Sequence, residues 1–282
     1  MADLAKHHEQ VGKTYDESGL ITYGFDYEVE RLEKHQPVEY AITKRYLQRY
    51  IADGTTVVDV GAGVGHYSEL LAQRGCFIYL VDVAERLLVT AKERLVDAGL
   101  EQQLLGIHHA SATNLSFLPD GCCDVVLLLG PLYHLDVAQE RQRALSEAAR
   151  ILRPGGLVFA AGINRMTWLN AAFNEYTNDV REQREFFERY IHDGRFYPPE
   201  LDRPGYVYLA TIEEFLVEFS AFTQLLLTGV ESFANYNQTS LLKADAENAE
   251  VWLDLIEQTG VTSAGLGMTG HFLYIGRKEK GI

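Results

Sequence analysis

Three glycines and an aspartate have a spacing that suits the binding of a nucleotide-like ligand. In "VVDVGAGVGHYSELLA", residues 57–72, Asp59 precedes Gly61, Gly63 and Gly65 at the end of an apolar run. Glycines at such a turn let backbone N–H groups approach a ligand without obstruction by side chains. The apolar run predicts a buried strand and the pattern after it a helix, so the loop would end the strand. We therefore expect either a dinucleotide or a nucleoside-type cofactor here.

Asp82 and the position of the third glycine help to decide between a dinucleotide and a nucleoside-type cofactor. A dinucleotide-binding loop reads G-x-G-x-x-G, and its third glycine would stand where this chain has His66. Asp82 ends the next predicted strand, "FIYLVDV", where the hydroxyl groups of a ribose would lie. Taken alone, Asp82 would equally suit a cap of the following helix. The loop favours the nucleoside-type cofactor and leaves a dinucleotide as the alternative.

The elements around this loop alternate between apolar strands and helices. We predict a helix over residues 37–54, and then strands and helices in turn over residues 56–163. Continuous apolar strands separated by helices are typical of a parallel sheet covered on both faces, an α/β fold. An aromatic and charged stretch over residues 164–210 interrupts the alternation. It is too long for an ordinary connection between a strand and a helix, and we expect a lid.

The chain resembles the class I S-adenosylmethionine-dependent methyltransferases in four successive segments: "VVDVGAGVGHYS", "YLVDVAERLL", "FLPDGCCDVVLLLGPLYHL" and "ARILRPGGLVFAAG". The loop "LLLGPLYHL" and the closing "HFLYIGRK" resemble a bacterial small-molecule branch of that family. The resemblance implies a Rossmann-like, seven-stranded, mostly parallel sheet with helices on both faces and an antiparallel last strand. It assigns a cofactor-binding core to residues 37–163, with a cofactor-covering segment over 1–36, a helical and aromatic lid over 164–210, and completion of the sheet over 211–282.

The resemblance also implies a role for individual residues in binding S-adenosylmethionine. Asp59 and the glycines would hold its amino-acid end, Asp82 would accept hydrogen bonds from both ribose hydroxyls, and Val83 would pack on adenine. Ser111 stands where the family usually has an aspartate, and its hydroxyl is a weaker acceptor than a carboxylate. The complete set of predicted cofactor contacts is Asp59, Gly61, Ala62, Gly63, Gly65, Tyr67, Asp82, Val83, Ser111, Ala112, Leu129, Gly130, Tyr15 and Tyr27.

Methyl transfer is an in-line displacement that needs alignment of the acceptor and, for a protonated acceptor, a base. Tyr133 and His134 follow the fourth predicted strand at its carboxyl end, where ligands of open α/β sheets react. His134 is the candidate base, with ordering of the loop as the competing interpretation. His271 begins the last predicted strand and is a further catalytic candidate, with core packing as its alternative.

Aromatic and basic residues in the two flanking segments are candidates for covering the site. Tyr15 and Tyr27 would close over the cofactor, or pack on the surface. In the predicted lid, Arg165, Trp168 and Tyr176 are candidate substrate-binding residues, because an arginine can select a carboxylate and aromatic rings can hold a planar molecule. The competing interpretation is that the aromatic residues form the lid's own small core.

The composition of the chain indicates which binding partners and which cellular compartment to expect. The 40 acidic against 25 basic residues give a formal net charge of -15, which repels phosphate backbones and argues against nucleic acid. The three cysteines show no metal-binding spacing with the histidines, so we predict no metal site and reduced thiols. The start of the chain lacks the apolar region of a signal peptide, and no long uncharged apolar run suggests a membrane span. We expect a cytoplasmic protein.

These features together predict an S-adenosylmethionine-dependent methyltransferase that modifies O, N or C of a small molecule and releases S-adenosylhomocysteine. A methyltransferase of RNA or protein is the main alternative. A NAD-linked oxidoreductase and a non-catalytic binding protein are the others. The predicted lid leaves a homodimer possible.

Overall fold

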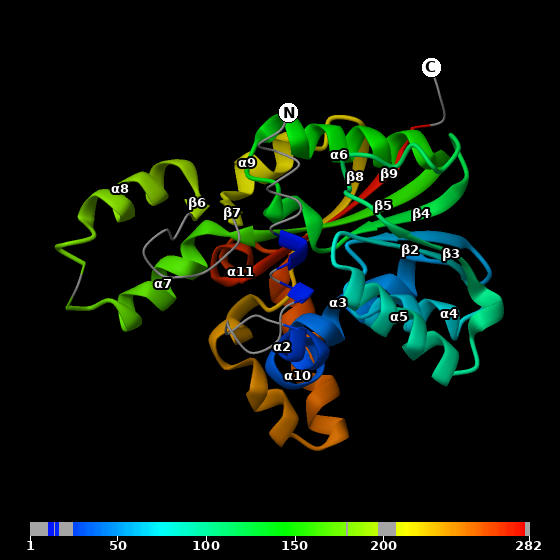
Figure 1. The fold of residues 1–282 in the computed structure, drawn as a ribbon. Helices are drawn as coiled ribbons and strands as arrows, with labels where there is room; N and C mark the ends of the chain where they lie inside the picture. The colour runs from blue at the N-terminus through cyan, green and yellow to red at the C-terminus, as the bar shows by residue number, and fades with distance from the viewer. Residues whose placement is uncertain (1–10, 14, 17–24, 179, 197–206, 280–282) are drawn as a thin grey trace.

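The computed structural model describes residues 11–13, 15–16, 25–178, 180–196 and 207–279 (Figure 1). These residues form a nine-stranded sheet. Its main run has the order β3-β2-β1-β4-β5-β9-β8, and the short β7 and β6 continue from the end of β5. The strands are β1 Thr56–Val60, β2 Phe77–Asp82, β3 Leu104–His109, β4 Cys123–Leu128, β5 Leu152–Asn164, β6 Arg195–Phe196, β7 Val207–Ala210, β8 Phe222–Gly229 and β9 His271–Lys278.

Strand directions confirm the predicted fold class. Strands β1 to β5 pair in parallel, whereas β9 runs antiparallel to both β5 and β8. The main run of the sheet is therefore the Rossmann-like arrangement expected from the sequence. The pair β6 and β7 was not foreseen, because β6 has only two residues and carries no pattern that a sequence can show.

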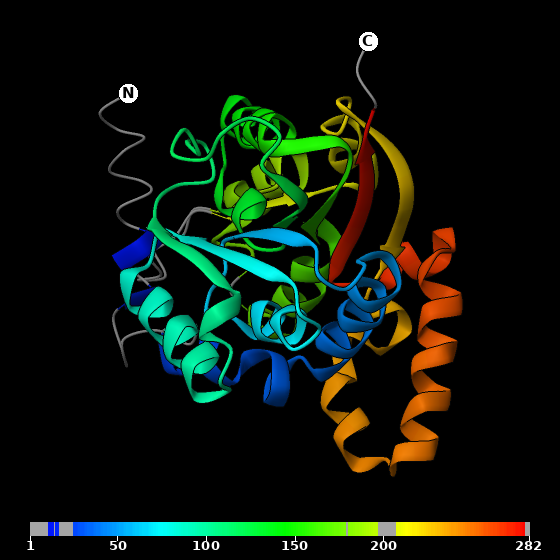
Figure 2. The same cartoon turned by 90° about the vertical axis from the view of Figure 1, so that its right-hand side faces the viewer.

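Helices cover both faces of the sheet (Figures 1 and 2). Because successive side chains of a strand point to opposite faces, Val57 joins one buried cluster and Val58 the other. The first cluster includes residues of α3, α4, α5 and α10, and the second includes residues of α6 and α9. The bounds of these helices are α3 Pro37–Tyr50, α4 His66–Ala72, α5 Glu85–Asp97, α6 Ala138–Ile151, α9 Ile212–Val217 and α10 Ala246–Gly260.

Two further groups of helices extend from the sheet. The insert after β5 forms α7 Arg165–Glu175 and α8 Arg184–Asp193, which project to the left in Figure 1. The stretch after β8 forms the 3-10 helix η4 Ser232–Lys243, followed by α10 and α11 Ser263–Met268, which make the lower arm in Figure 2. Within the part of the chain that the structure describes, no helix is long and apolar enough to cross a membrane.

The N-terminal part lies over the carboxyl ends of the parallel strands. It comprises the short helical pieces at 11–13 and 15–16, α2 Phe25–Glu30 and η1 Arg31–His35, a π-helical turn that leads into α3. Asp16 accepts hydrogen bonds from the backbone N–H groups of Glu85 and Arg86 at the start of α5. A Cβ atom at Gly12 would lie 2.3 Å from the carbonyl oxygen of Val83. The segment therefore packs directly on the end of β2.

Two glycines have the same backbone angle but differ in how closely other atoms pack around them. This difference predicts how much an alanine at each position would destabilise the protein. Gly54 and Gly61 both have φ of +75°, but a Cβ atom at Gly61 would lie 2.7 Å from Cδ of Pro131, whereas nothing lies within 4 Å at Gly54. Gly54→Ala should therefore cost about 1–2 kcal/mol for the left-handed conformation alone. Gly61→Ala should cost about 1–3 kcal/mol more through overpacking. Urea unfolding measures both, and equal losses would contradict the packing at Pro131.

Candidate functional site

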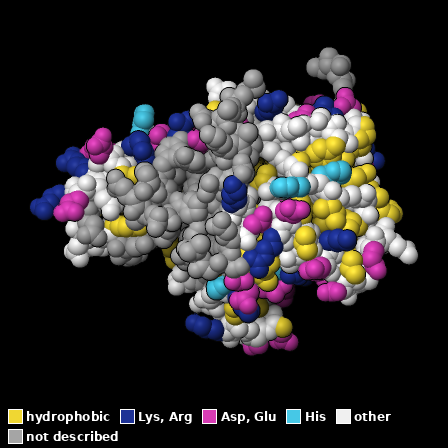
Figure 3. Space-filling model, in the orientation of Figure 1, with side chains coloured by type: hydrophobic (Ala, Val, Ile, Leu, Met, Phe, Trp, Pro, Cys, Tyr) yellow, Lys and Arg dark blue, Asp and Glu magenta, His cyan; other side chains and the backbone are white. Residues whose placement is uncertain are grey.

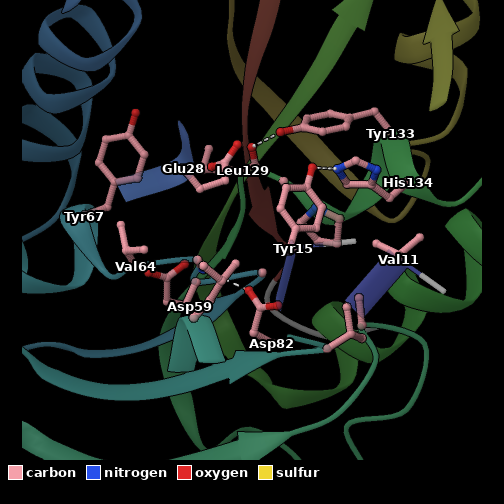
Figure 4. Close-up of a pocket in the computed structure, with 18 of the residues that line it drawn as sticks. Val11, Tyr15, Glu28, Asp59, Val64, Tyr67, Asp82, Leu129, Tyr133 and His134 are labelled. Atoms are coloured by element: carbon pink, nitrogen blue, oxygen red, sulfur yellow. Dashed lines mark hydrogen bonds between the residues drawn. The ribbon is translucent and has the colours of Figure 1, made fainter. Parts of the chain in front are cut away.

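A cavity opens at the carboxyl ends of β1, β2 and β4, beneath the N-terminal segment (Figure 4). Parallel strands end at the same edge of a sheet, which is why side chains far apart in the sequence meet there. The predicted cofactor contacts that line this cavity are Tyr15, Asp59, Gly61, Ala62, Gly63, Tyr67, Asp82, Val83, Ser111, Ala112, Leu129 and Gly130. The structure thus brings most of the predicted set into one place.

Asp59 is a buried acid at the floor of the cavity. Its Oδ2 accepts a hydrogen bond of 2.6 Å from the hydroxyl of Ser68 on α4. Burial raises the pKa of Asp59 to about 7, although the Ser68 hydrogen bond acts against this. A cationic group in the cavity would stabilise the ionised form. The site therefore suits a ligand that brings an ammonium group to this position.

Asp82 stands at the end of β2 and is fixed by the backbone. Its Oδ2 accepts from the N–H of Gly63 at 2.8 Å, and its Oδ1 accepts from the N–H of Ala84 at 2.9 Å. Burial raises its pKa. A carboxylate has about four acceptor positions, so each oxygen retains the capacity to accept one more hydrogen bond. This arrangement fits a pair of neighbouring hydroxyl groups.

The part of the cavity beyond Asp82 is mostly apolar. Val83, Leu87 and Ala112 line it together with Val11 of the N-terminal segment. Ser111 also lines it, but its hydroxyl lies 3.0 Å from that of Thr113 and accepts from the Thr113 N–H. An aromatic heterocycle would fit between these apolar walls, and a direct hydrogen bond from Ser111 to it stays a prediction.

Tyr133 and His134 lie in η3 Pro131–His134, directly after β4, and both line the cavity. The hydroxyl of Tyr15 lies 2.8 Å from Nε2 of His134 (Figure 4). The hydroxyl of Tyr133 donates to the carbonyl oxygen of Leu129 at 3.4 Å, and burial raises the pKa of Tyr133. The N-terminal segment and the loop after β4 therefore meet over the cavity, with a phenol held against His134.

Sequence reasoning missed two charged residues that line the cavity, Glu28 of α2 and Arg31 of η1. Nε of Arg31 donates to Glu28 at 3.2 Å, and its Nη1 donates to Glu39 of α3 at 3.0 Å. The spacing of Glu28 and Arg31 predicts a pair on one helix face. That signal could have marked the segment as a helix, but nothing in it indicates which cavity the pair faces.

His66, which takes the place of a dinucleotide loop's third glycine, also lines the cavity. Its ring is buried, and burial together with the nearby Arg94 lowers its pKa to about 4. His66 is therefore neutral at physiological pH and serves as a wall of the cavity.

Several predicted site residues lie elsewhere. Gly65 has φ of +80° and precedes α4, with a Cβ atom there only 3.0 Å from Cβ of Ala91, so it serves close packing. Tyr27 stacks on His35 at 4.9 Å between ring centroids. Neither residue is among those that line the cavity, and their contact with a cofactor stays a prediction.

The predicted lid residues make contacts within their own part of the fold. Trp168 packs against Phe186, Phe187 and Tyr190, which agrees with the interpretation that the aromatic residues form a small core. Arg165 donates to the carbonyl oxygen of Leu209 and pairs with Glu214. Tyr176 contacts Phe187. None of Arg165, Trp168 and Tyr176 lines the described cavity, and their role toward a substrate stays a prediction.

His271, the third catalytic candidate, begins β9 and is not among the residues that line the cavity. Its Nδ1 donates to Oε1 of Glu231 at 2.6 Å and lies 3.7 Å from Oε2 of Glu39. Burial acts to lower its pKa, but the carboxylates of Glu39 and Glu231 raise it to about 9. The ring is thus protonated at neutral pH, which disfavours its use as a base.

The residues that line the cavity fit a cofactor that has an ammonium group, a ribose and an adenine-like ring. Asp59 is a buried carboxylate without a cationic partner among the described contacts, Asp82 has spare acceptor capacity, and the walls beyond it are apolar. Gly63 has φ of +54°, and nothing lies within 4 Å of the position of a Cβ atom there. There is thus open space beside Gly63, but its N–H group already donates to Asp82, and its contact with a ligand stays a prediction.

Comparisons with known proteins show similarity to methyltransferases. Residues 58–160 match the family described as "Methyltransferase domain". The chain is 33% identical to a ubiquinone biosynthesis O-methyltransferase of Aromatoleum aromaticum, over 40% of this chain and 45% of that protein. It is also 33% identical to the enzyme of the same name in Caulobacter vibrioides, over 40% of this chain and 42% of that protein. The matches thus span less than half of the length of these relatives.

A solved structure shows the same fold over most of the chain. An S-adenosylmethionine-dependent methyltransferase of Methanosarcina mazei has a TM-score of 0.57 and 18% identity, covering 84% of this chain and 98% of that one. At this identity the likeness concerns the fold. Residues 58–160 therefore match a methyltransferase domain, and the chain as a whole shares the fold of this solved methyltransferase.

Proposed function

We propose that this chain transfers the methyl group of S-adenosylmethionine to an oxygen atom of a small molecule. The observation that carries the proposal is the cavity in which Asp59, Asp82 and the glycine loop meet the loop of Tyr133 and His134. The choice of oxygen is supported by the names of the relatives, which are O-methyltransferases. The choice of a small molecule is supported by the net charge of -15 and by the segment that covers the cavity.

Each end of the cofactor has a matching group in the cavity. Asp59 would pair with the ammonium group, Asp82 would accept from the two ribose hydroxyls, and Val83 would pack on the adenine. Arg31 lines the same cavity and would attract the carboxylate of the amino-acid end. S-adenosylmethionine supplies the transferable methyl group, which is bonded to a positively charged sulfur atom.

The chain's own contribution to the reaction is to orient the acceptor, exclude water and remove a proton. His134 would accept the proton of an acceptor hydroxyl at Nε2, the atom that now contacts the hydroxyl of Tyr15. Tyr133 and Leu129 would shape the wall beside the reacting atoms. The N-terminal segment would keep water out when the cavity is filled.

Product analysis tests the proposed function directly. The full chain is incubated with methyl-labelled S-adenosylmethionine and separate sets of phenols, amines, carboxylic acids, total RNA and a peptide library. We expect label in an oxygen of a small molecule, with S-adenosylhomocysteine formed in equal amount. Label found in RNA or peptide and absent from the small molecules would contradict the proposal.

The buried acid at the cavity floor predicts a pH dependence of binding. An ammonium group binds the ionised form of Asp59, whose pKa is about 7 in the free protein. Below that pH a proton must be released on binding, so affinity should rise with pH, by up to about tenfold per pH unit between 5.5 and 7. His66 does not titrate in this range, since its pKa is about 4.

Calorimetry with S-adenosylhomocysteine in buffers of different ionisation enthalpy measures both the affinity and the proton release. Asp59→Asn should bind more weakly at pH 7.5 and lose most of the dependence on pH. A wild-type affinity that stays constant from pH 5.5 to 7, or an unchanged slope in Asp59→Asn, would show that Asp59 does not pair with the ammonium group.

A further inference from the structure

The carboxylate of Glu231, between β8 and η4, is fully buried and held by several donors. Its Oε2 accepts from the hydroxyl of Thr269 at 2.6 Å and from the backbone N–H groups of Gly270 and His271 at 3.0 and 2.8 Å. The next residue, Ser232, has φ of 48°, a conformation that residues other than glycine rarely adopt. These three donors thus hold Oε2 of Glu231 in place, and the other carboxylate oxygen, Oε1, faces His271.

His271 lies between carboxylates from two elements. Nδ1 of its ring donates to Oε1 of Glu231 at 2.6 Å and lies 3.7 Å from Glu39 of α3. Arg31 of η1 is the nearby cation, and it donates to Glu39 and Glu28. Two carboxylates beside one imidazole favour its protonated form, in which both nitrogens are donors. Because Nδ1 faces Glu231, Nε2 lies on the opposite side of the ring.

The ring stands next to the place where the acceptor would react. His271 pairs with Ile163 of β5, at the same edge of the sheet as the end of β4. Its ring centroid lies 6.4 Å from that of Tyr133, which lines the cavity. The side chain of His271 is 14% exposed, whereas that of Glu231 is 0% exposed. A ligand beside Tyr133 would therefore meet the histidine rather than the glutamate behind it.

We propose that Glu231 is a positioning residue that fixes and charges His271, and that the Nε2–H group of His271 binds an anionic oxygen of the methyl acceptor. This inference rests on the proposed function and narrows its substrate class to small molecules with a phenolate or carboxylate oxygen. A ring that already carries both protons cannot accept another, so His134 remains the base. Glu39 and Arg31 complete the charged groups around the ring.

The variant Glu231→Gln tests whether Glu231 positions and charges His271 or only forms an ion pair that stabilises the fold. The three donors at Oε2 require an oxygen there, so the glutamine must turn its NH₂ group toward His271. Nδ1 then has to act as an acceptor, and the ring becomes neutral with its proton on Nε2. The matched control is Glu218→Gln, which breaks another buried pair, between Oε1 of Glu218 and Nε of Arg141 at 2.6 Å, with neither residue in the cavity lining.

The test uses the full chain saturated with S-adenosylhomocysteine and labelled with ¹⁵N-histidine. NMR follows the His271 ring from pH 6 to 10, and then during titration with 3,4-dihydroxybenzoate, an anionic probe, and with histamine, a cationic one. We expect the wild-type ring to be charged at pH 7 and the ring in Glu231→Gln to be neutral there. Dihydroxybenzoate should shift the Nε2 signal and should bind Glu231→Gln about 3–10-fold more weakly, because the Nε2–H group still donates but no longer carries a charge.

Glu218→Gln should bind dihydroxybenzoate like the wild type, and Glu231→Asp should recover part of the affinity. The inference is overturned if a folded Glu231→Gln binds dihydroxybenzoate as tightly as the wild type, or if histamine shifts the His271 signal and dihydroxybenzoate does not. Loss of S-adenosylhomocysteine binding by the wild type would instead count against the proposed function, because the charge of the His271 ring can be read without any ligand.

Discussion

Asp82→Ala is expected to weaken the binding of S-adenosylmethionine by about 100-fold or more. The carboxylate would accept hydrogen bonds from two ribose hydroxyls, and hydrogen bonds to a charged group contribute about 1.5–3 kcal/mol each. Its position is fixed by the N–H groups of Gly63 and Ala84, so few other conformations compete with the binding geometry. Isothermal titration calorimetry with S-adenosylmethionine measures the loss.

Two variants in the same cavity serve as controls for Asp82. Asp82→Asn keeps one oxygen acceptor and should lose less affinity than the alanine variant. Ser111→Ala removes a hydroxyl whose described partner is Thr113, and it should change the affinity by less than about fivefold. Binding by a folded Asp82→Ala at the wild-type affinity would refute the ribose assignment. Thermal unfolding of each variant shows whether it is folded.

His134→Ala is expected to lower kcat by about 100–10,000-fold, the usual contribution of a general base. The affinity for S-adenosylhomocysteine should change much less, because the role proposed for His134 is toward the acceptor and not toward the cofactor. Added imidazole should restore part of the rate in the alanine variant. The measurement is the initial rate of methyl transfer to the acceptor found in the labelled screen.

Tyr133→Phe is the matched control for His134, since it lies in the same turn and loses only the hydroxyl that donates to Leu129 at 3.4 Å. Its kcat should stay within about fivefold of the wild type. Near-normal turnover by His134→Ala would remove the histidine from the chemistry and leave it a role in ordering the loop. A loss in Tyr133→Phe as large as that in His134→Ala would assign the effect to the loop as a whole.

That most of the predicted cofactor contacts would meet in one cavity was largely predictable from sequence. Asp59, the glycine loop and Asp82 each follow a strand whose apolar run is visible in the chain, and the ends of parallel strands must meet at one edge. Local patterns therefore determined both the residues and their place. The parallel strands of the main run were predictable for the same reason, whereas the antiparallel last strand was implied by the resemblance to the methyltransferase family.

The charged groups on the acceptor side were not predictable in this way. Glu39 and Glu231 are separated from His271 by long stretches of chain. Their contacts with it depend on how α3 packs beside β9 and on the pairing of β8 with β9. No short motif marks such a contact. The sequence singled out His271 as a catalytic candidate but not the two glutamates, whose carboxylates raise the pKa of its ring to about 9.

The insert after β5 shows a second limit of local patterns. Aromatic residues such as Trp168 suit either a substrate pocket or a small core, and composition alone does not separate the two. The contacts of Trp168 with Phe186 and Tyr190 favour the core. Arg165 likewise has Glu214 as a partner, a contact between α7 and α9 that only the tertiary structure reveals.

Calorimetric titration of the wild-type chain with S-adenosylhomocysteine and, separately, with NAD tests most directly whether this cavity binds the methyltransferase cofactor or a dinucleotide. We expect one S-adenosylhomocysteine bound per chain and no measurable heat with NAD. The binding of S-adenosylhomocysteine should be lost in Asp82→Ala. Binding of NAD in place of S-adenosylhomocysteine, or S-adenosylhomocysteine binding that Asp82→Ala leaves unchanged, would contradict this expectation.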